Sequence, residues 1–402
     1  MRYTSILLSI LVIATVTSCQ KTDLGQPSVA HDSNDNTVAL SEAVEVASSF
    51  ATSEKSFLQT RSSDPTVKET FSIKDDNIEP YFHVVNFENG GFVAISGDNR
   101  TEPILAYSND TYWENNPEEY PYGLMLWIDN TKAVIDSLRT TNAKQGINIK
   151  KKWDSFTPKK LTRSLDPGSG VAVEIDTTVG PLIFDSWHRY QPYNDSLDLV
   201  YKYIGNYYIR PTVGCVPLSI ARIVRFHSYP TSYPWSSILD NGSSSPATKQ
   251  YIKNVYYDVK SYCETHGYMF YQDDYGNTFV DSDLPISSLI NDKFGGWSGA
   301  EMSYNTANPS HVEILKNEFI NHSRPVIISG GGHMWVCDGC HYKVEVEYDD
   351  LNQPIAFVYT TFHHRWGEEG NAFDGWFAHN NLSPGNHNLN SNVILTYNLS
   401  PL

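Results

Sequence analysis

Basic residues are scarce in this chain of 402 residues. Its 29 lysines and arginines stand against 46 aspartates and glutamates, which gives a formal net charge of −17 and a pI near 5.1. A protein that binds nucleic acid needs a basic face for the phosphates, so this balance excludes nucleic acid as a partner. The sequence also lacks internal repeats, which excludes a repeat architecture.

Apolar runs long enough to span a bilayer are lacking too. The run "ILLSILVIATV", from Ile6, is too short for a permanent transmembrane helix. This run follows a short basic N-terminal segment and precedes two small residues and Cys19. In this order, residues 1–19 resemble a bacterial lipoprotein signal peptide with its lipobox. We therefore expect an exported protein that is anchored to the cell envelope by a lipid on Cys19. A plain cleaved signal peptide is the alternative.

Cysteine is rare, and four of the five lie in the body of the chain: Cys215, Cys263, Cys337 and Cys340. An even number in an exported protein admits two disulfides, but a Cys337–Cys340 bridge would close a very tight loop, so we expect mostly free thiols. Cys337, Cys340 and His341 also match the C-x-x-C-H pattern of haem attachment and could supply part of a zinc site. Because this motif lies between strand-like runs, we expect no cofactor and no metal.

The length predicts two domains behind a flexible tether over residues 20–39. Residues 40–142, the front domain, carry a helical pattern, two alternating apolar runs around a glycine turn and a second amphipathic helix, which predicts a small α+β domain. Residues 143–170 are rich in lysine and lack a sustained period, so we expect an exposed linker that proteases can cut. Residues 171–402, the back domain, show one early helix followed by strand-like runs, which predicts an α+β fold.

Cys215 lies at a position where a reactive cysteine is expected, the start of a predicted helix. Cys215 follows Gly214 and precedes apolar residues at helical spacing, and Pro217 fits the first turn of that helix. The unpaired N–H groups at a helix N-terminus favour a thiolate over a thiol. Cys215 is therefore a candidate nucleophile, with an inert buried cysteine as the alternative.

A histidine far along the chain supplies the partner that such a thiol needs. His333 follows three glycines, which leave the backbone open to a substrate chain. An imidazole can accept the proton of the thiol and later give it to the leaving amine. A lone histidine near a strand is more often structural than catalytic. The catalytic interpretation of His333 therefore depends on its pairing with Cys215.

These residues lie in motifs that resemble the streptopain-like cysteine peptidases of the papain-like group. The nucleophile helix of that family is matched by Gly214-Cys215-Val216, Ala221 and Tyr229-Pro230, and its "GGHxxxxDG" pattern by Gly331-Gly332-His333 and Asp338-Gly339. Its tryptophan-rich C-terminal segment is matched in part by "HHRWGEEGNAFDGWF", from His363. In the front domain, "NFENGGFVAISGDNR" and "PILAYS" resemble the family's propeptide.

The resemblance implies a zymogen with a papain-like peptidase fold behind a small α+β propeptide domain. The propeptide would inhibit its own peptidase, and cleavage in the linker would free an endopeptidase that acts on proteins or peptides. Because the expected lipid lies on the propeptide side of the linker, we expect activation to release the peptidase from the membrane unless the cut propeptide stays bound. Cys215 would be the nucleophile and His333 the general base and acid. The backbone N–H of Cys215 would stabilise the oxyanion.

Two positions depart from the family pattern. Arg365 stands before Trp366, where the family has the asparagine that orients the histidine, and Arg189 stands in "WHRYQPYN" where the family has its oxyanion glutamine. Gln191 follows two residues later. Arginine cannot accept a hydrogen bond from the imidazole and its charge opposes an imidazolium, so Arg365→Asn is expected to preserve or raise turnover. We expect Trp366 to shield the pair and Arg189 or Gln191 to donate to the oxyanion.

A second hypothesis follows from these departures. A surface lipoprotein with an impaired peptidase site could bind peptides or proteins without cutting them. Selective reaction of Cys215 with a thiol reagent separates the two hypotheses, because an activated thiol reacts faster than a structural one.

Overall fold

The structure is a computed structural model that describes residues 36–402 with gaps. The gaps are residues 54–64, 77, 89, 142, 157–171, 203–204, 242–244, 282, 306–307, 331, 349–352, 368–372 and 380–392. The described residues form one compact unit that starts at Asn36. The predicted signal, Cys19, most of the tether and residues 157–170 of the predicted linker lie outside the described residues.

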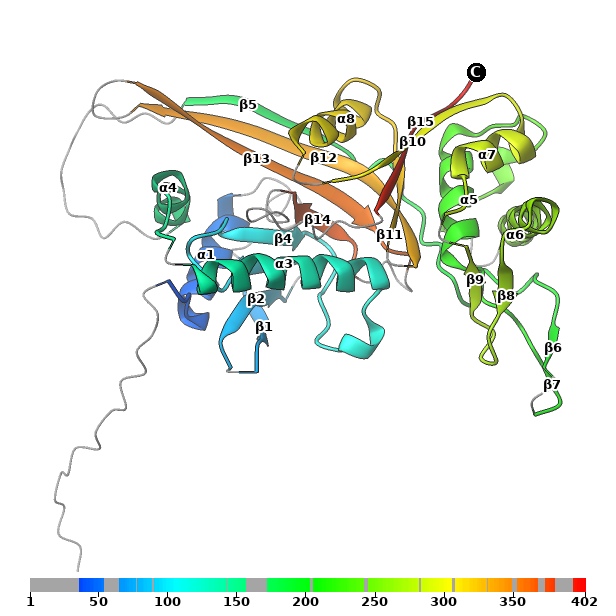
Figure 1. Cartoon of the computed structure of the whole chain (residues 1–402), viewed down its shortest axis with the longest axis horizontal. Coiled ribbons are helices and arrows are strands. Elements are labelled where there is room, and N and C mark those ends of the chain that lie inside the picture. The colour runs from blue at the N-terminus through cyan, green and yellow to red at the C-terminus, as the bar shows by residue number, and fades with distance from the viewer. Residues whose placement is uncertain are drawn as a thin grey trace, which may run out of the picture. The chain divides into compact units, whose positions relative to one another are not determined.

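Helices lie in both predicted domains. They are α1 (Leu40–Ser53), α3 (Tyr122–Thr140), α4 (Ile147–Phe156), α5 (Cys215–His227), α6 (Pro246–His266), α7 (Ile286–Phe294) and α8 (Pro309–Ile320), with short 3₁₀ turns at Pro117–Glu119 and Trp235–Ser237. Figure 1 shows α5, α6 and α7 together at one end of the unit, α1 and α4 toward the other end, and α3 along the middle. None of the described helices is both long and apolar enough to cross a membrane.

Local sequence explains where several helices begin and end. The Ser245 side chain accepts a hydrogen bond from the backbone N–H of Thr248 at 3.2 Å and caps α6, which ends at Gly267 with a φ of +80°. This serine start and glycine end are the preferred pair, because the serine oxygen satisfies an unpaired N–H and glycine adopts the left-handed conformation without strain. In the same way, the Asn308 side chain caps α8 by accepting from the N–H of Ser310.

Most strands belong to one large sheet. They are β1 (Val67–Lys74), β2 (Pro80–Phe87), β3 (Phe92–Ser96), β4 (Ile104–Ser108), β5 (Ala172–Val179), β10 (Trp297–Ser303), β11 (Val326–Gly330), β12 (His333–Tyr348), β13 (Pro354–Arg365), β14 (Gly375–Ala378) and β15 (Ile394–Pro401). The order is β1-β2-β3-β4-β14-β13-β12-β11-β15-β10, and β5 also pairs with β12. Two small hairpins are separate, β6 (Val200–Lys202) with β7 (Tyr207–Ile209) and β8 (Phe270–Gln272) with β9 (Thr278–Val280). Mixed helices and strands confirm the predicted α+β class.

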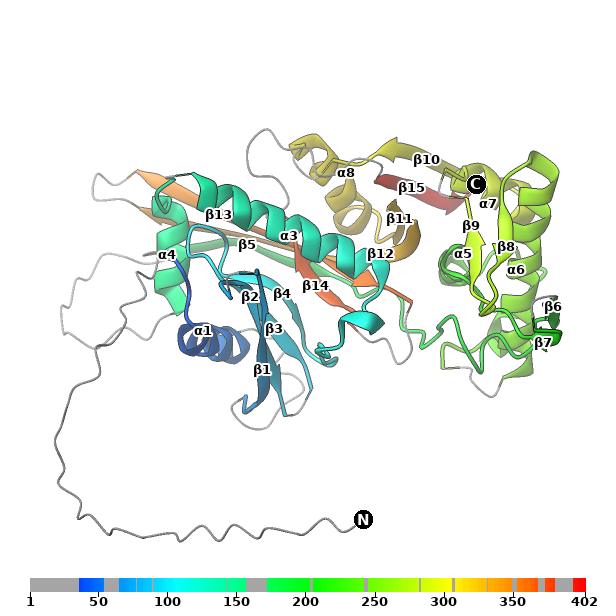
Figure 2. The ribbon, with the colours of Figure 1, turned by 60° about the horizontal axis from the view of Figure 1, so that its bottom comes forward.

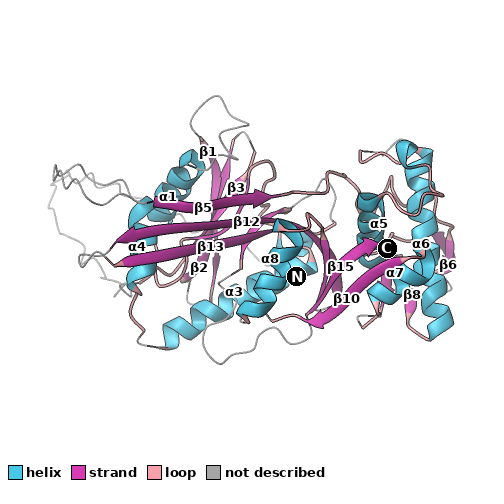
Figure 3. Ribbon diagram, turned by 90° about the horizontal axis from the view of Figure 1, so that it is seen from above, coloured by secondary structure: helices cyan, strands magenta, loops and turns pink. Residues whose placement is uncertain are grey.

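The sheet runs without a break from the front domain into the back domain. β4 pairs with β14 in antiparallel register, with Tyr107 opposite Trp376 and Ala106 opposite Phe377. The long strands β12 and β13 then lead toward the helices of the back domain (Figure 3). The predicted glycine turn between β2 and β3 is confirmed at Gly90 and Gly91, whose φ angles of +91° and +87° require a residue without a side chain.

Three apolar clusters hold these elements together. The first lies within the back domain around α5, α6 and α7, and the third packs α1 and α4 against the front strands. The second spans both domains, since it joins Trp113 and Trp127 of the front domain to Trp335, Trp366 and Phe377 of the back domain. The two domains therefore share one of their cores.

Part of the predicted linker is a helix instead of an exposed segment. α4 occupies residues 147–156, and Trp153 and Lys152 in it are buried. The Trp153 indole N–H donates to the carbonyl of Thr101 at 2.9 Å, and the Lys152 ammonium bonds Glu102 at 2.7 Å. For these residues the expectation of an exposed linker is wrong, because partners in the front domain compensate for burying the lysine charge.

Candidate active site

Cys215 is the first residue of α5, as its sequence context predicts. Gly214 precedes it with a φ of +82°, a conformation that turns the chain sharply into the helix, and Pro217 lies in the first turn. The residue is partly buried, and its thiol is free. The backbone N–H groups of Val216 and Met334 donate toward its sulfur.

His333 is the first residue of β12 and is buried. Its Nε2 lies 3.2 Å from the carbonyl oxygen of Trp366, so Nε2–H donates to that carbonyl and Nδ1 is the nitrogen that can accept a proton. The imidazole also stacks on the Trp335 ring, with centroids 6.1 Å apart. A backbone carbonyl thus holds the histidine in the tautomer that a general base needs.

The fold brings the two predicted residues to one site. The N–H that reaches the Cys215 sulfur belongs to Met334, the residue directly after His333. The Arg189 guanidinium acts on both groups, because its charge opposes the rise that burial causes in the pKa of the Cys215 thiol and adds to the fall that burial causes in the pKa of the His333 imidazole. Cys215, His333 and Arg189 therefore share one electrostatic environment although they lie far apart in the sequence.

Burial shifts both members of the pair toward their neutral forms. Burial raises the pKa of Cys215, and the opposing charge of Arg189 and the backbone N–H groups do not reverse that rise. Burial and Arg189 lower the pKa of His333 to about 3. Desolvation thus opposes the acidification of Cys215 that its position at the helix N-terminus was expected to give.

Arg365 does not point its charge at His333. Its guanidinium donates to the backbone carbonyls of Ile183, at 2.7 Å, and of Asp185. It also lies 3.9 Å from the Asp185 carboxylate and 3.8 Å from that of Asp374. Arg222 pairs with the same Asp185 at 3.0 Å. Arg365 therefore belongs to a buried charge network that holds the loop leading to Arg189, and the sequence-based concern that it opposes the imidazolium is not supported.

The group that orients His333 is one that sequence analysis missed. The Trp366 backbone N–H donates to the Asp374 carboxylate at 2.9 Å, and the Trp366 indole N–H donates to the carbonyl of Phe373 at 2.9 Å. These two bonds fix the peptide whose carbonyl accepts from His333. Any residue type has a carbonyl, so no side-chain pattern could have revealed this role.

The two oxyanion candidates differ in their surroundings. Arg189 is the one whose charge reaches the Cys215 thiol, and its guanidinium packs over the ring of Tyr190 at 5.4 Å. Gln191 lies on an exposed stretch two residues later. The geometry thus favours Arg189 over Gln191 as a donor near the sulfur.

The remaining cysteines lie in the protein interior. Cys263, Cys337 and Cys340 are buried free thiols, as predicted, and burial raises the pKa of Cys263 to about 11 and of Cys340 to about 12. His341 of the C-x-x-C-H motif is bonded to Asp176 at 3.2 Å and to the Tyr107 hydroxyl at 3.1 Å. Within the described residues, no cluster of three metal-ligating side chains occurs.

Comparison with known proteins identifies both domains. Residues 35–135 match the model of the Spi protease inhibitor family, and residues 231–377 match that of the peptidase C10 family. Streptopain from Streptococcus pyogenes is 23% identical over 352 residues, which cover 75% of this chain and 74% of streptopain. A mutant fragment of prointerpain A from Prevotella intermedia has the same fold, with a TM-score of 0.55, 17% identity and coverage of 83% of this chain and 98% of that one.

Over residues 231–377 the chain resembles the peptidase C10 family. The two family matches and the similarity to streptopain confirm the resemblance to streptopain-like cysteine peptidases with a propeptide, and they support a zymogen organisation. The front domain is the propeptide. Cys215 lies between the two matched ranges, so its role depends on the geometry described above.

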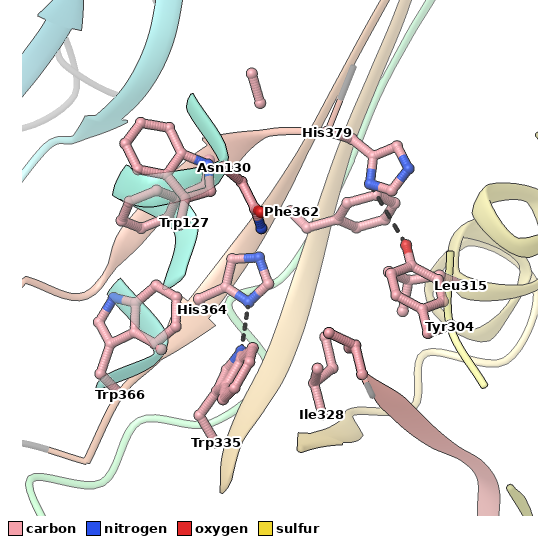
Figure 4. A pocket seen from close by; sticks show the side chains of 14 residues that line it. Trp127, Asn130, Tyr304, Leu315, Ile328, Trp335, Phe362, His364, Trp366 and His379 are labelled. Atoms are coloured by element: carbon pink, nitrogen blue, oxygen red, sulfur yellow. Dashed lines mark hydrogen bonds between the residues drawn. The ribbon is translucent and has the colours of Figure 1, made fainter. Parts of the chain in front are cut away.

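The propeptide packs directly against the tryptophans beside the active site. Figure 2 shows α3 running across the strands of the peptidase. Its residues Gly123, Trp127 and Asn130 close one side of a cavity whose other walls include Trp335 and Trp366. Figure 4 shows the side chain of Asn130 directed into this cavity, beside His364. The propeptide thus covers the Trp366 side of the site.

The fit of α3 on Trp366 leaves no room for a side chain at Gly123. A glycine-to-alanine change in a helix ordinarily stabilises by up to about 1 kcal/mol. Here an added Cβ would lie 2.4 Å from the Trp366 ring, so Gly123→Ala is expected to destabilise the zymogen by about 1–3 kcal/mol and to lower its Tm. Gly146→Ala is the matched control, since a Cβ there meets nothing within 4 Å. A Tm at or above that of the unchanged protein would contradict the packing described.

Proposed function

We propose that this peptidase is an exported endopeptidase zymogen that hydrolyses peptide bonds with Cys215 as nucleophile and His333 as general base and acid. The observation that carries the proposal is the shared site of the two residues. The Met334 N–H reaches the Cys215 sulfur, and the Trp366 carbonyl holds His333 with Nδ1 available as an acceptor. The match to the peptidase C10 family and the propeptide support the reaction class.

The reaction follows from these positions. The His333 Nδ1 takes the proton of the Cys215 thiol, and the thiolate attacks the carbonyl carbon of the scissile bond. The negative oxygen that forms is stabilised by the Cys215 N–H and the Arg189 guanidinium, and a donor of this kind contributes about 2.7–4 kcal/mol. His333 then protonates the leaving amine as the C–N bond breaks. Water, deprotonated by His333, hydrolyses the thioester and restores the thiol.

Trp366 takes over the orienting role that the family's asparagine would have. Its carbonyl accepts from His333 Nε2–H and would stabilise an imidazolium, because a carbonyl oxygen is an acceptor for the charged donor. The Trp366 ring packs on Trp335, whose own ring stacks on the His333 imidazole. Arg365 supports the site indirectly by holding the loop that carries Arg189.

The competing function is a peptide-binding surface protein whose site no longer cuts. The departures from the family pattern at Arg365 and Arg189 are the observation that favours it. Removal of the propeptide separates the two functions, because only an enzyme needs the thiolate to form once the site opens.

The test is reaction with iodoacetamide after cleavage in the linker and separation of the propeptide. Cys215 is expected to react more than about a thousandfold faster than Cys263 at pH 7, since a pKa of about 11 leaves about one Cys263 thiol in ten thousand ionised. The same preparation is expected to hydrolyse unstructured peptides, and both properties vanish in Cys215→Ala. Equal, slow labelling of Cys215 and Cys263 would favour the binding protein.

We also propose that the zymogen is anchored to the cell envelope by a lipid on Cys19. The support is the sequence of residues 1–19, in which a basic start, an apolar run and small residues precede the cysteine. The tether that follows places the anchor on the propeptide side of the linker. Membrane attachment therefore acts on the peptidase through the propeptide.

A further inference from the structure

The two small hairpins of the peptidase carry a dense group of exposed apolar side chains. We call it the tyrosine surface, and its members are Tyr207, Tyr208, Met269, Tyr271, Tyr275 and Phe279, with exposed fractions between 38% and 82%. Other large exposed apolar residues of the described chain are spread over separate elements. A gathered apolar surface of this kind marks an interaction site more often than scattered residues do.

The hairpins form one surface because they are bonded to each other. The Lys202 ammonium of β6 donates to the carbonyl of Gln272 in β8 at 2.7 Å, and the Tyr207 hydroxyl donates to the carbonyl of Asp274. The rings of Tyr271 and Phe279 stack across β8 and β9 with centroids 5.2 Å apart. Figure 1 shows both hairpins at the end of the unit away from the propeptide.

The surface is also fastened to the segment that carries the nucleophile. The Thr278 hydroxyl donates to the carbonyl of Thr212 at 2.6 Å, the Thr278 N–H donates to the Thr212 hydroxyl, and the Thr212 N–H donates to the carbonyl of Gly276. Gly214 packs on the Thr278 side chain so closely that an added Cβ would lie 3.2 Å away. A polypeptide bound at this surface is therefore held at a fixed distance from Cys215.

The charge around the tyrosine surface indicates which kind of polypeptide would bind there. Residues 268–292, which include β8 and β9, contain five aspartates and no lysine or arginine, and Asp274 and Asp283 in this stretch are exposed. Cations bind over the faces of tyrosine rings and pair with nearby carboxylates. The net charge of −17 adds a long-range attraction for basic partners and a repulsion for acidic ones.

We propose that the tyrosine surface binds a lysine- or arginine-rich segment of the polypeptide substrate while another segment of that substrate lies at Cys215. This proposal rests on the proposed function and names its substrate class: basic polypeptides that also carry apolar side chains. Tyrosine suits such a role because its ring offers a large rigid contact area at low cost in side-chain entropy. Rates of association would fall with salt, since the attraction is partly electrostatic.

The test compares two fluorogenic peptides with the same cleavable segment, one extended at both ends by lysine and leucine and the other by glutamate and leucine. The protein is the full chain after linker cleavage and separation of the propeptide. The combined change Tyr208→Ser, Tyr271→Ser and Tyr275→Ser is expected to raise KM for the basic peptide about tenfold, with kcat and the acidic peptide unchanged. Phe184→Ser is the matched control, because Phe184 is 75% exposed and lies outside the surface.

The outcomes separate this proposal from the proposed function. Cleavage of both peptides with equal kcat/KM, or an unchanged KM in the triple variant, would overturn the tyrosine surface and leave the peptidase intact. If neither peptide is cut, binding to the tyrosine surface can still be measured by fluorescence anisotropy with Cys215→Ala protein. The basic peptide is expected to bind this protein, and the three tyrosine changes are expected to weaken that binding about tenfold. Binding of uncharged phosphatidylcholine vesicles in place of the basic peptide would assign the surface to a membrane and reject the proposal.

Discussion

Arg365→Asn is expected to destabilise the protein strongly and to lower peptide hydrolysis. The guanidinium satisfies two buried backbone carbonyls and neutralises the Asp185 and Asp374 carboxylates. Removing one partner from a buried charge network costs about 3–5 kcal/mol, because the remaining charges keep their desolvation penalty. In a chain of this size, that loss corresponds to a fall in Tm of about 5–10 °C. Activity falls with it because the loop to Arg189 loses its support.

Thermal unfolding and kcat/KM of the activated variant check this expectation. Lys150→Asn is a suitable control, since Lys150 makes only an exposed pair with Asp154 and its loss changes stability by about 0.5 kcal/mol or less. An unchanged Tm with raised turnover would restore the expectation from sequence alone, in which Arg365 stands in for asparagine and opposes the imidazolium.

The second large effect concerns the membrane. After complete cleavage between residues 157 and 170, the peptidase is expected to stay in the membrane fraction together with the propeptide. The two parts share an apolar core, β4 pairs with β14, and the Tyr107 hydroxyl bonds His341 across the junction. Cutting the linker breaks none of these contacts. The release expected from the sequence therefore needs a second step that separates the propeptide.

Fractionation of cells that express the full chain tests this expectation. Washing with buffer is expected to leave both fragments in the membrane fraction, and mild denaturant is expected to free the peptidase alone. The variant Cys19→Ala is the control, because without the proposed lipid both fragments are expected in the soluble fraction. If the peptidase is recovered in the first wash after complete cleavage, the shared core does not hold it to the propeptide.

The sequence predicted those parts of the molecule that depend on local patterns. The helix that begins at Cys215 was recognisable because glycine, cysteine and proline occur in the order that a helix start requires, and α5 begins there. The turn between β2 and β3 was recognisable because two glycines interrupt alternating apolar residues. Family motifs then placed His333 with Cys215, which no local pattern could have done.

The errors arose where distant partners decide the outcome. Residues 147–156 resemble an exposed linker because of their lysines, but α4 forms because Trp153 and Lys152 find Thr101 and Glu102. Arg365 resembles a damaging substitution next to Trp366, but its partners Ile183 and Asp185 lie about 180 residues earlier. The acidic thiol was expected from helix position alone, and that argument left out the desolvation of Cys215 by its surroundings.

The pairing of β4 with β14 has a consequence for making the enzyme in the laboratory. In a back domain produced alone, β14 would be an unpaired edge strand that carries Trp376 and Phe377. Other chains can add to such an edge and aggregate. Recombinant production should therefore start from the complete precursor, or supply residues 36–156 as a separate polypeptide during refolding. The isolated back domain is expected to form inclusion bodies. Once dissolved, it is expected to refold to active enzyme only when the second polypeptide is present.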